Sequence, residues 1–146
     1  MLFRSACELL GGVLADYLAE FSADEDMYEP RDLGLIPIPL STERLRERGY
    51  NQAERIVACA LMQLGLAQAA SIDTLVRIRN TASQAKLPRE ERLRNMEGAF
   101  VAHNVNTSLT YVLVDDVMTT GATFAAGAQA LKEGGTTRVI CVALAH

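Results

Sequence analysis

The sequence VLVDDVMTTGAT, residues 112–123, decides how this chain of 146 residues is interpreted. With Tyr111 before it, its first three residues form a continuous apolar run, which is typical of a strand covered on both faces. Two adjacent aspartates follow, and small and hydroxyl-bearing residues then lead into a helix expected over residues 122–133. In open α/β sheets, ligands bind outside the carboxyl ends of the strands. The sequence therefore predicts a binding site at this strand-to-helix turn.

The residues of the turn are of the types that bind a phosphate. They are Thr119, Thr120, Gly121, Ala122 and Thr123. At the start of a helix, unpaired backbone N–H groups and the positive end of the dipole would hold a phosphate monoester. Asp115 and Asp116 cannot bind the same anion, because like charges repel. They suit neutral hydroxyl donors or Mg²⁺ held through water.

A simpler interpretation of the same residues is a solvated turn in which the threonines cap a helix. It would be preferred for two aspartates alone, but the strand, the acids, the threonines and the helix together favour a site. The sequence has no GxxxxGK[ST] and no GxGxxG, which counts against a P-loop nucleotidase and against a dinucleotide enzyme.

Composition predicts one globular domain, residues 1–146, in which residues 1–32 form a helix and an acidic connector and residues 33–146 form the core. A chain of this length buries enough surface to fold without disulfides or a metal. The formal net charge is -4, with 14 basic and 18 acidic side chains. A dedicated duplex-DNA binder is therefore excluded, because it uses a cationic excess to displace counterions.

Charge is unevenly distributed along the chain. Residues 1–32 hold eight acidic and two basic side chains, whereas residues 77–94 hold six basic and two acidic ones. The second segment is either an ordinary solvated face or a region that attracts anions. It could contact single-stranded DNA, although it offers few aromatic side chains for base stacking.

Hydrophobic spacing and breakers predict the other elements. Helices are expected over residues 3–21 and 52–68, and strands over 35–39, 72–78, 99–102, 111–114 and 139–144. Residues 80–97 are polar and basic, and are expected to form a long excursion with at most one helical turn after Pro88. This alternation predicts an α/β fold: a doubly wound, mainly parallel sheet of about five strands with flanking helices.

Several features indicate a soluble cytoplasmic protein. Cys7, Cys59 and Cys141 are odd in number, far apart and embedded in apolar stretches, so they are expected to be reduced core residues. His103 and His146 have no partners at metal-ligand spacing. Charged residues interrupt the N-terminal apolar stretch, so we expect no membrane partner. The apolar face of the first helix packs either on its own core or on a second copy, and a homodimer is one expectation.

The sequence VLVDDVMTTGATF, residues 112–124, resembles the phosphoribosyl pyrophosphate (PRPP) motif of type I phosphoribosyltransferases. Two further segments, IPIPL at 36–40 and RGYNQA at 48–53, are similar to the ComF/GntX group, named for competence and gluconate utilisation. So are Gln84, Leu87, Arg92, Asn95, Gly98, Ala99 and Phe100. The resemblance covers residues 35–146 and implies the type I phosphoribosyltransferase fold with a mobile hood loop.

The resemblance also implies roles for individual residues. Asp115 and Asp116 would bind the ribose hydroxyls and, through water, Mg²⁺, while the turn at 119–123 would bind the 5-phosphate; with Arg92 the two aspartates would form the catalytic set. The pyrophosphate loop would comprise Leu40, Ser41, Arg44, Arg48, Asn51 and Gln52. The hood would comprise Gln84, Lys86, Arg89, Arg92 and Asn95. Other roles stay open: Arg48 as a surface charge, Asn51 as a helix cap, and Arg92 with Asn95 as braces of a short helix.

The implied function is transfer of a phosphoribosyl group from PRPP, with release of pyrophosphate, linked to competence and DNA uptake. The alternative is a non-catalytic module that senses PRPP or a nucleotide and acts with competence proteins or single-stranded DNA. Members of the group usually have an N-terminal zinc ribbon of paired cysteines, which residues 1–146 do not contain, so the sequence is either a part of a longer chain or a form without the ribbon. Tyr50 stands where phenylalanine is usual. No residue pattern identifies the acceptor base.

Overall fold

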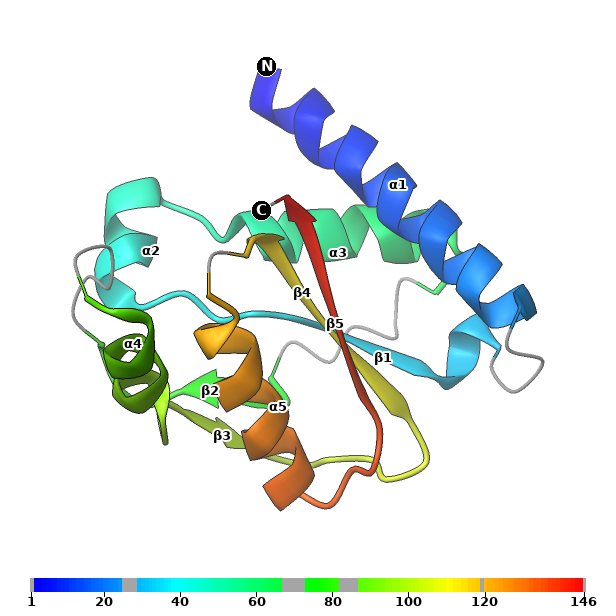
Figure 1. Ribbon diagram of the computed structural model, residues 1–146. Coiled ribbons are helices and arrows are strands. Elements are labelled where there is room, and N and C mark those ends of the chain that lie inside the picture. The colour runs from blue at the N-terminus through cyan, green and yellow to red at the C-terminus, as the bar shows by residue number, and fades with distance from the viewer. Residues whose placement is uncertain (1, 25–28, 67–72, 82–86, 119, 146) are drawn as a thin grey trace.

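The computed structural model describes residues 2–24, 29–66, 73–81, 87–118 and 120–145. Its centre is a parallel sheet of three strands in the order β1-β4-β5: β1 (Leu33–Pro37), β4 (Thr110–Val117) and β5 (Val139–Ala145). Leu35 pairs with Val112, which pairs in turn with Ile140. Because the strands are parallel, their carboxyl ends meet at one edge of the sheet (Figure 1).

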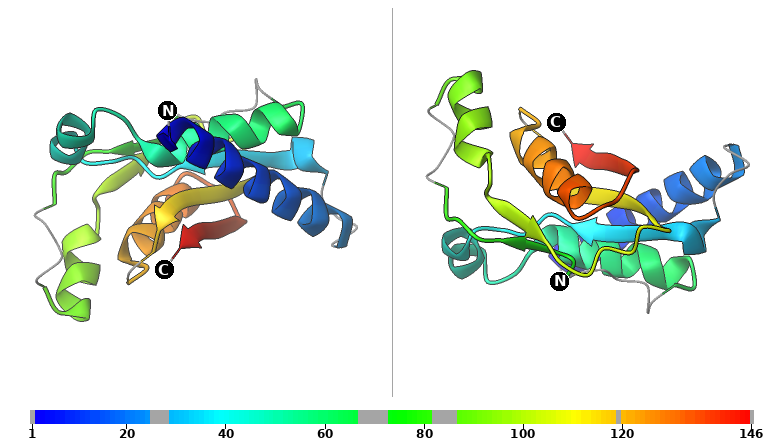
Figure 2. Two further views of the ribbon diagram at one scale, coloured as in Figure 1. Left: turned by 90° about the horizontal axis from the view of Figure 1, so that it is seen from above. Right: turned by 90° about the horizontal axis from the view of Figure 1, so that it is seen from below.

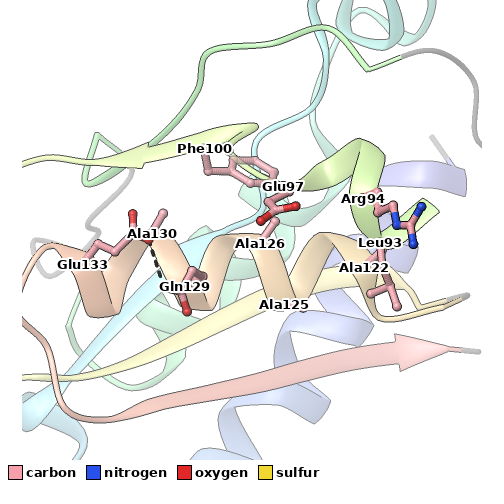
Figure 3. Close-up of a pocket in the computed structure, with 11 residues that line it drawn as sticks. Leu93, Arg94, Glu97, Phe100, Ala122, Ala125, Ala126, Gln129, Ala130 and Glu133 are labelled. Atoms are coloured by element: carbon pink, nitrogen blue, oxygen red, sulfur yellow. Dashed lines mark hydrogen bonds between the residues drawn. The ribbon is translucent and has the colours of Figure 1, made fainter. Parts of the chain in front are cut away.

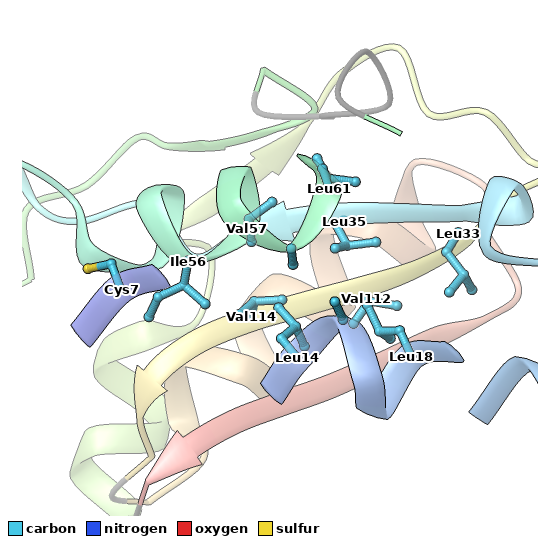
Figure 4. Packing of buried hydrophobic residues seen from close by; sticks show 12 residues of the cluster. Cys7, Leu14, Leu18, Leu33, Leu35, Ile56, Val57, Leu61, Val112 and Val114 are labelled. Atoms are coloured by element: carbon cyan, nitrogen blue, oxygen red, sulfur yellow. The ribbon is translucent and has the colours of Figure 1, made fainter. Parts of the chain in front are cut away.

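Helices cover both faces of this sheet, as Figures 1 and 2 show. On one face lie α1 (Leu2–Asp24) and α3 (Gln52–Gln63), whose side chains share a core cluster with Leu35 and Val112 (Figure 4). On the other lies α5 (Ala122–Glu133), in a second cluster with Ile36 and Leu113. Successive strand residues therefore alternate between the two clusters, as the pleat requires. The predicted α/β class, with a parallel sheet covered on both faces, is confirmed.

The number of strands in the parallel sheet is smaller than the predicted five. The other two strands, β2 (Leu75–Arg77) and β3 (Phe100–Ala102), form a separate antiparallel pair in which Val76 faces Val101. They pack over α5 through buried Leu75 and Phe100, which belong to the same cluster as Ile36. A short apolar run does not indicate which sheet its strand joins. The sequence therefore did not assign β2 and β3 to a sheet of their own.

Two helices differ from the prediction. A helix α2 (Thr42–Arg48) follows β1 where a loop was expected, because Ser41 caps its first turn and Gly49 ends it with a φ of 77°. Helix α4 (Arg89–Met96) spans eight residues rather than at most one turn. Buried Met96 anchors it against the α5 cluster.

The N-terminal helix is held by close contact with α3. An added Cβ at Gly11 would collide with the Cβ of Cys59 and would lie 3.1 Å from the carbonyl of Ile56. A short 3₁₀ helix, η1 (Pro30–Asp32), leads directly into β1. In the described part of the chain, no helix has the length and apolar character needed to cross a bilayer.

Candidate functional site

The site is built at the carboxyl edge, defined here as the last residues of β1, β4 and β5 with the segments that follow them. Pairing continues past the strand ends: the Ile38 amide donates to the Val114 carbonyl at 2.8 Å, and the Met118 amide donates to the Ala145 carbonyl at 2.9 Å. These bonds hold the start of each connecting segment against the sheet. Side chains that follow β1 and β4 are thereby fixed next to each other.

Asp115 and Asp116 lie in the last three residues of β4, and both are partly buried. The Asp116 amide donates to Oδ1 of Asp115 at 2.9 Å, and the Val117 amide donates to Oδ1 of Asp116 at 3.0 Å. Each carboxylate is thus held by the backbone of the residue after it. One oxygen of each carboxylate is left outside these two bonds.

The pKa of Asp115 is raised from 3.8 to about 7, mainly by burial and further by the side-chain hydrogen bond and the negative charge of Asp116. The hydrogen bond from the Asp116 amide and the positive charge of Arg44 lower the pKa, but both effects are smaller. A carboxyl group with this pKa takes up or releases a proton near neutral pH. The pair therefore gains full negative charge when a cation or a hydroxyl-bearing ligand favours the ionised form.

The turn after β4 leads into a helix without a side-chain cap. Gly121 precedes α5 with a φ of 75°, in the left-handed region that favours glycine. The Ala122 amide lies 3.5 Å from Oγ1 of Thr120, at the limit of a hydrogen bond. The predicted phosphate-binding residues Thr120–Thr123 therefore surround the start of α5, while Thr119 lies outside the described residues.

Helix α2 brings two arginines to the carboxyl edge. Nη1 of Arg48 lies 3.9 Å from Oδ2 of Asp116, and the charge of Arg44 lowers the pKa of Asp115. Both arginines are exposed, whereas Ser41 is buried and accepts from the Arg44 amide at 3.3 Å. The predicted pyrophosphate residues Leu40–Arg44 thus form the end of the β1 segment and the first turn of α2.

The side chain of Asn51 is buried and hydrogen-bonded to the backbone, so it has a structural role. It is 4% exposed, its side-chain amide donates to the Ile38 carbonyl at 2.9 Å, and its Oδ1 accepts from the Ala53 amide at 3.0 Å. It therefore caps α3 and ties that cap to the segment after β1. Gln52, the first residue of α3, is partly buried beside it.

The predicted hood residues divide between α4 and an undescribed segment. Nε of Arg92 donates to the Leu87 carbonyl at 2.7 Å, which braces the start of α4, and the Asn95 carbonyl accepts from Nη2 of Arg79 at 3.1 Å. Arg89 is exposed on the first turn of α4. Gln84 and Lys86 lie outside the described residues.

Two residues near the carboxyl edge were not among the predicted site residues. Asn80 accepts through Oδ1 from both the amide and the hydroxyl of Thr42, at 3.2 and 2.7 Å, and so fixes the start of α2. Arg77 lies over the ring of Phe100 at 5.6 Å, and burial followed by the charge of Arg44 lowers its pKa. Arg77 is the last residue of β2, and Asn80 follows that strand. This position at the end of a strand was the available signal, but the sheet that the strand joins was not predicted.

A cleft of about 420 Å³ separates α4 from α5 (Figure 3). Alanines of α5 and Phe100 form its apolar part, while Arg94, Glu97, Gln129 and Glu133 supply polar groups. It shares Ala122 with the turn after β4 but is lined by neither aspartate. We place the candidate site at the carboxyl edge rather than in this cleft, because the paired acids and the uncapped helix start lie there.

The carboxyl edge could bind Mg²⁺ only with a small number of protein ligands, because it offers few carboxylates. Among the described residues, no group of three or more histidine, cysteine, aspartate or glutamate side chains could hold a metal ion. Asp115 and Asp116 provide two adjacent carboxylates, and Mg²⁺ commonly binds one or two carboxylates while keeping waters and substrate oxygens. These two residues fit such an ion, held jointly with a bound substrate.

Comparison with known proteins finds related sequences over most of the chain. Competence protein ComFC of Bacillus subtilis is 33% identical over 133 residues, which cover 91% of this chain and 51% of ComFC. DNA utilization protein YhgH of Salmonella typhi is 34% identical over 137 residues, or 88% of this chain and 60% of YhgH. ComFC of Streptococcus pneumoniae is 32% identical over 127 residues, or 87% of this chain and 52% of its own length. The chain thus spans between about half and three fifths of these relatives. No protein-family model matches it.

Proposed function

Because this chain is a ComF-like protein, we propose that its carboxyl edge binds PRPP with Mg²⁺ and transfers the phosphoribosyl group in a step linked to competence and DNA utilisation. The observation that carries the proposal is the arrangement around residues 115–122. Two carboxylates held by the backbone stand next to a helix that starts without a side-chain cap. A sugar phosphate needs these two types of group close together, because its hydroxyls donate and its phosphate accepts.

In the proposed complex, Asp115 and Asp116 accept from the ribose hydroxyls, and the first amides of α5 donate to the 5-phosphate. Arg44 and Arg48 of α2 act electrostatically on the same aspartates and would provide positive charge for the pyrophosphate. Bound Mg²⁺ would be held by the two aspartates and would offset the charge of the leaving pyrophosphate. Displacement of pyrophosphate from C1 of the ribose requires no protein nucleophile, so positioning and charge neutralisation are what these residues contribute.

Titration calorimetry with PRPP, with and without Mg²⁺, tests the proposal. We expect saturable binding that depends on Mg²⁺ and is lost in the variant Asp115→Asn/Asp116→Asn. The matched control Glu8→Gln/Glu20→Gln removes the same two charges from exposed positions on α1 and should bind as the wild type does. Equal PRPP affinity in the wild type and the aspartate variant would refute the proposed site.

A binding module without catalysis is the second candidate, and the position of Arg92 favours it. Arg92 is the predicted catalytic residue of the hood, yet its Nε is engaged by the Leu87 carbonyl and braces α4. Release of pyrophosphate, measured with a panel of bases in the presence of PRPP and Mg²⁺, separates the two candidates. Turnover supports the transferase, whereas PRPP binding without turnover for any base supports the sensing module.

A further inference from the structure

From the contacts at the start of α2, we propose that Asn80 is a positioning residue, which holds α2 in the place from which Arg44 and Arg48 reach the pyrophosphate of PRPP. This role rests on the proposed function, because α2 is the helix that supplies positive charge to that site. Asn80 belongs to a different part of the chain, the segment after β2, and would act on the ligand only through α2.

Helix α2 lacks a buried apolar face. None of its seven residues is buried, and its one large apolar side chain, that of Leu45, is 43% exposed. Isolated helices shorter than about 12 residues are marginal in water, and most helices in proteins are stabilised by packing of an apolar face. The position of α2 must therefore be set by polar contacts.

Some of these polar contacts fix the shape of α2 rather than its place. Ser41 caps the first turn and Gly49 ends the helix, but both belong to the same stretch of chain. The ion pair of Arg48 with Asp116 reaches another element, yet its atoms lie 3.9 Å apart and the arginine side chain is 46% exposed. Exposed ion pairs contribute little to stability. Among the described residues, the stronger link of α2 to a distant segment is therefore the contact with Asn80.

Asn80 binds the first residue of α2 at two points. Its Oδ1 accepts from the Thr42 hydroxyl at 2.7 Å and from the Thr42 amide at 3.2 Å. One oxygen thus fixes both the side chain and the backbone where the helix begins. Arg44 lies two residues further on, and Arg48 lies about 9 Å along the helix at 1.5 Å per residue. A shift of Thr42 would therefore move both guanidinium groups.

The segment that carries Asn80 is itself well anchored. It follows β2, which is paired with β3. Nη2 of Arg79 donates to the carbonyls of Asn95, at 3.1 Å, and Glu97, which ties this segment to the end of α4. Both views in Figure 2 place α2 and α4 at the same end of the molecule. Asn80 therefore connects α2 to a part of the fold whose position is fixed.

The arrangement held by Asn80 brings like charges together. Burial and then the charge of Arg44 lower the pKa of Arg77, so these two guanidinium groups lie within electrostatic range of each other. Nη2 of Arg77 donates to the Thr81 hydroxyl at 2.5 Å, which holds this guanidinium in place. Pyrophosphate bound beside Arg44 would compensate the repulsion, because arginine recognises phosphate oxygens through charge-assisted hydrogen bonds.

Calorimetry in the presence of Mg²⁺ with pyrophosphate, PRPP and ribose 5-phosphate tests the role of Asn80. In Asn80→Ala, affinity for pyrophosphate and for PRPP should fall about tenfold, since loss of two hydrogen bonds makes the docked position of α2 a minor state. Affinity for ribose 5-phosphate, which has no pyrophosphate group, should not change. Asn106→Ala is the matched control: this exposed asparagine accepts from the Ser108 amide at 3.0 Å and precedes β4, at the opposite edge of the sheet. It should bind all three compounds as the wild type does.

The double variant Thr42→Val/Asn80→Ala separates positioning from direct contact with the ligand. Valine removes the hydroxyl of Thr42 but keeps the shape of its side chain, so the double variant should bind pyrophosphate no more weakly than Asn80→Ala alone. Nitrogen-15 relaxation without ligand gives an independent measure. The order parameters of the Leu45 and Glu47 amides should fall from about 0.85 to below about 0.6 in Asn80→Ala, while those of α5 stay unchanged.

The possible failures can be told apart. Unchanged order parameters in α2, unchanged pyrophosphate affinity in Asn80→Ala, an equal loss of affinity for ribose 5-phosphate, or additive effects of the two substitutions would each overturn the role of Asn80. A wild type that binds neither PRPP nor pyrophosphate would instead overturn the proposed function, and this role with it, even where the relaxation data show that α2 is loosened.

Discussion

Replacing Asp115 by asparagine should make the folded protein more stable at neutral pH. The aspartate is buried beside a second carboxylate, and its pKa is raised to about 7 in the fold from 3.8. The asparagine side chain keeps an oxygen that can accept from the Asp116 amide but carries no charge. The substitution therefore removes the cost of ionising a buried carboxyl group and keeps its hydrogen bond.

The magnitude and its pH dependence follow from this pKa. A folded-state pKa above the unfolded value means that stability is fully present below pH 3.8 and is lost as pH rises through 7, because the unfolded chain ionises first. At about 1.4 kcal/mol per pH unit the loss is at most about 4 kcal/mol. Since Asp115 is only partly buried, solvent screening reduces the expected loss to about 2 kcal/mol.

Urea unfolding of the wild type and Asp115→Asn between roughly pH 4 and pH 8.5 measures this difference. The two proteins should be almost equally stable at the acidic end, and the variant should gain about 2 kcal/mol by pH 8. Asp73→Asn, at an exposed aspartate, serves as the control and should show no such divergence. Carbon-13 titration of the Asp115 carboxyl group gives the pKa directly, and a midpoint near 4 would refute the reasoning from burial.

Three further perturbations test other contacts. Arg48→Gln removes the 3.9 Å ion pair at the carboxyl edge; because the arginine is 46% exposed, stability should change by less than about 1 kcal/mol while calorimetric PRPP affinity falls at least about tenfold. Asn51→Ala removes a helix cap and leaves the buried Ile38 carbonyl without its donor, so urea unfolding should show a loss of about 2 to 3 kcal/mol. Gly11→Ala forces a methyl group onto Cys59 and should cost about 1 to 3 kcal/mol in the same assay; an unchanged midpoint would mean that α1 does not pack closely on α3.

Sequence reasoning located the strand-to-helix turn well because several local signals coincide there. The apolar run before Asp115, the glycine at 121 and the periodic helix after it all depend on neighbours in the sequence. Helix α2 was not predicted because such local signals are absent there. None of its seven residues is buried, so its sequence has no periodic apolar face that would indicate a helix. Its position depends on the Ser41 cap and on Asn80, which is 38 residues away from Thr42.

Relations between distant segments explain the remaining differences. The ion pair between Arg48 and Asp116 and the assignment of β2 and β3 to a separate sheet both depend on tertiary packing. A strand of three residues is compatible with either sheet, and only the contacts of Leu75 and Phe100 with the α5 cluster decide between them. For the same reason, sequence alone did not reveal that Asn51 supports the segment after β1.

The start of α5 differs from the starts of α2 and α3. Helix α2 is capped by Ser41 and α3 by Asn51, both buried and both hydrogen-bonded to the first turn. Helix α5 follows Gly121 without such a cap, and the adjacent strand end holds two carboxylates whose proximity is unfavourable. Helix α4 also begins without a side-chain cap, after Pro88, so it is the combination of a missing cap with paired acids that sets the start of α5 apart. Locally unfavourable choices that cluster in one place are expected where ligand binding rather than stability determines the residues. A phosphate would satisfy the free amides of α5, and a cation or ribose hydroxyls would compensate the paired acids.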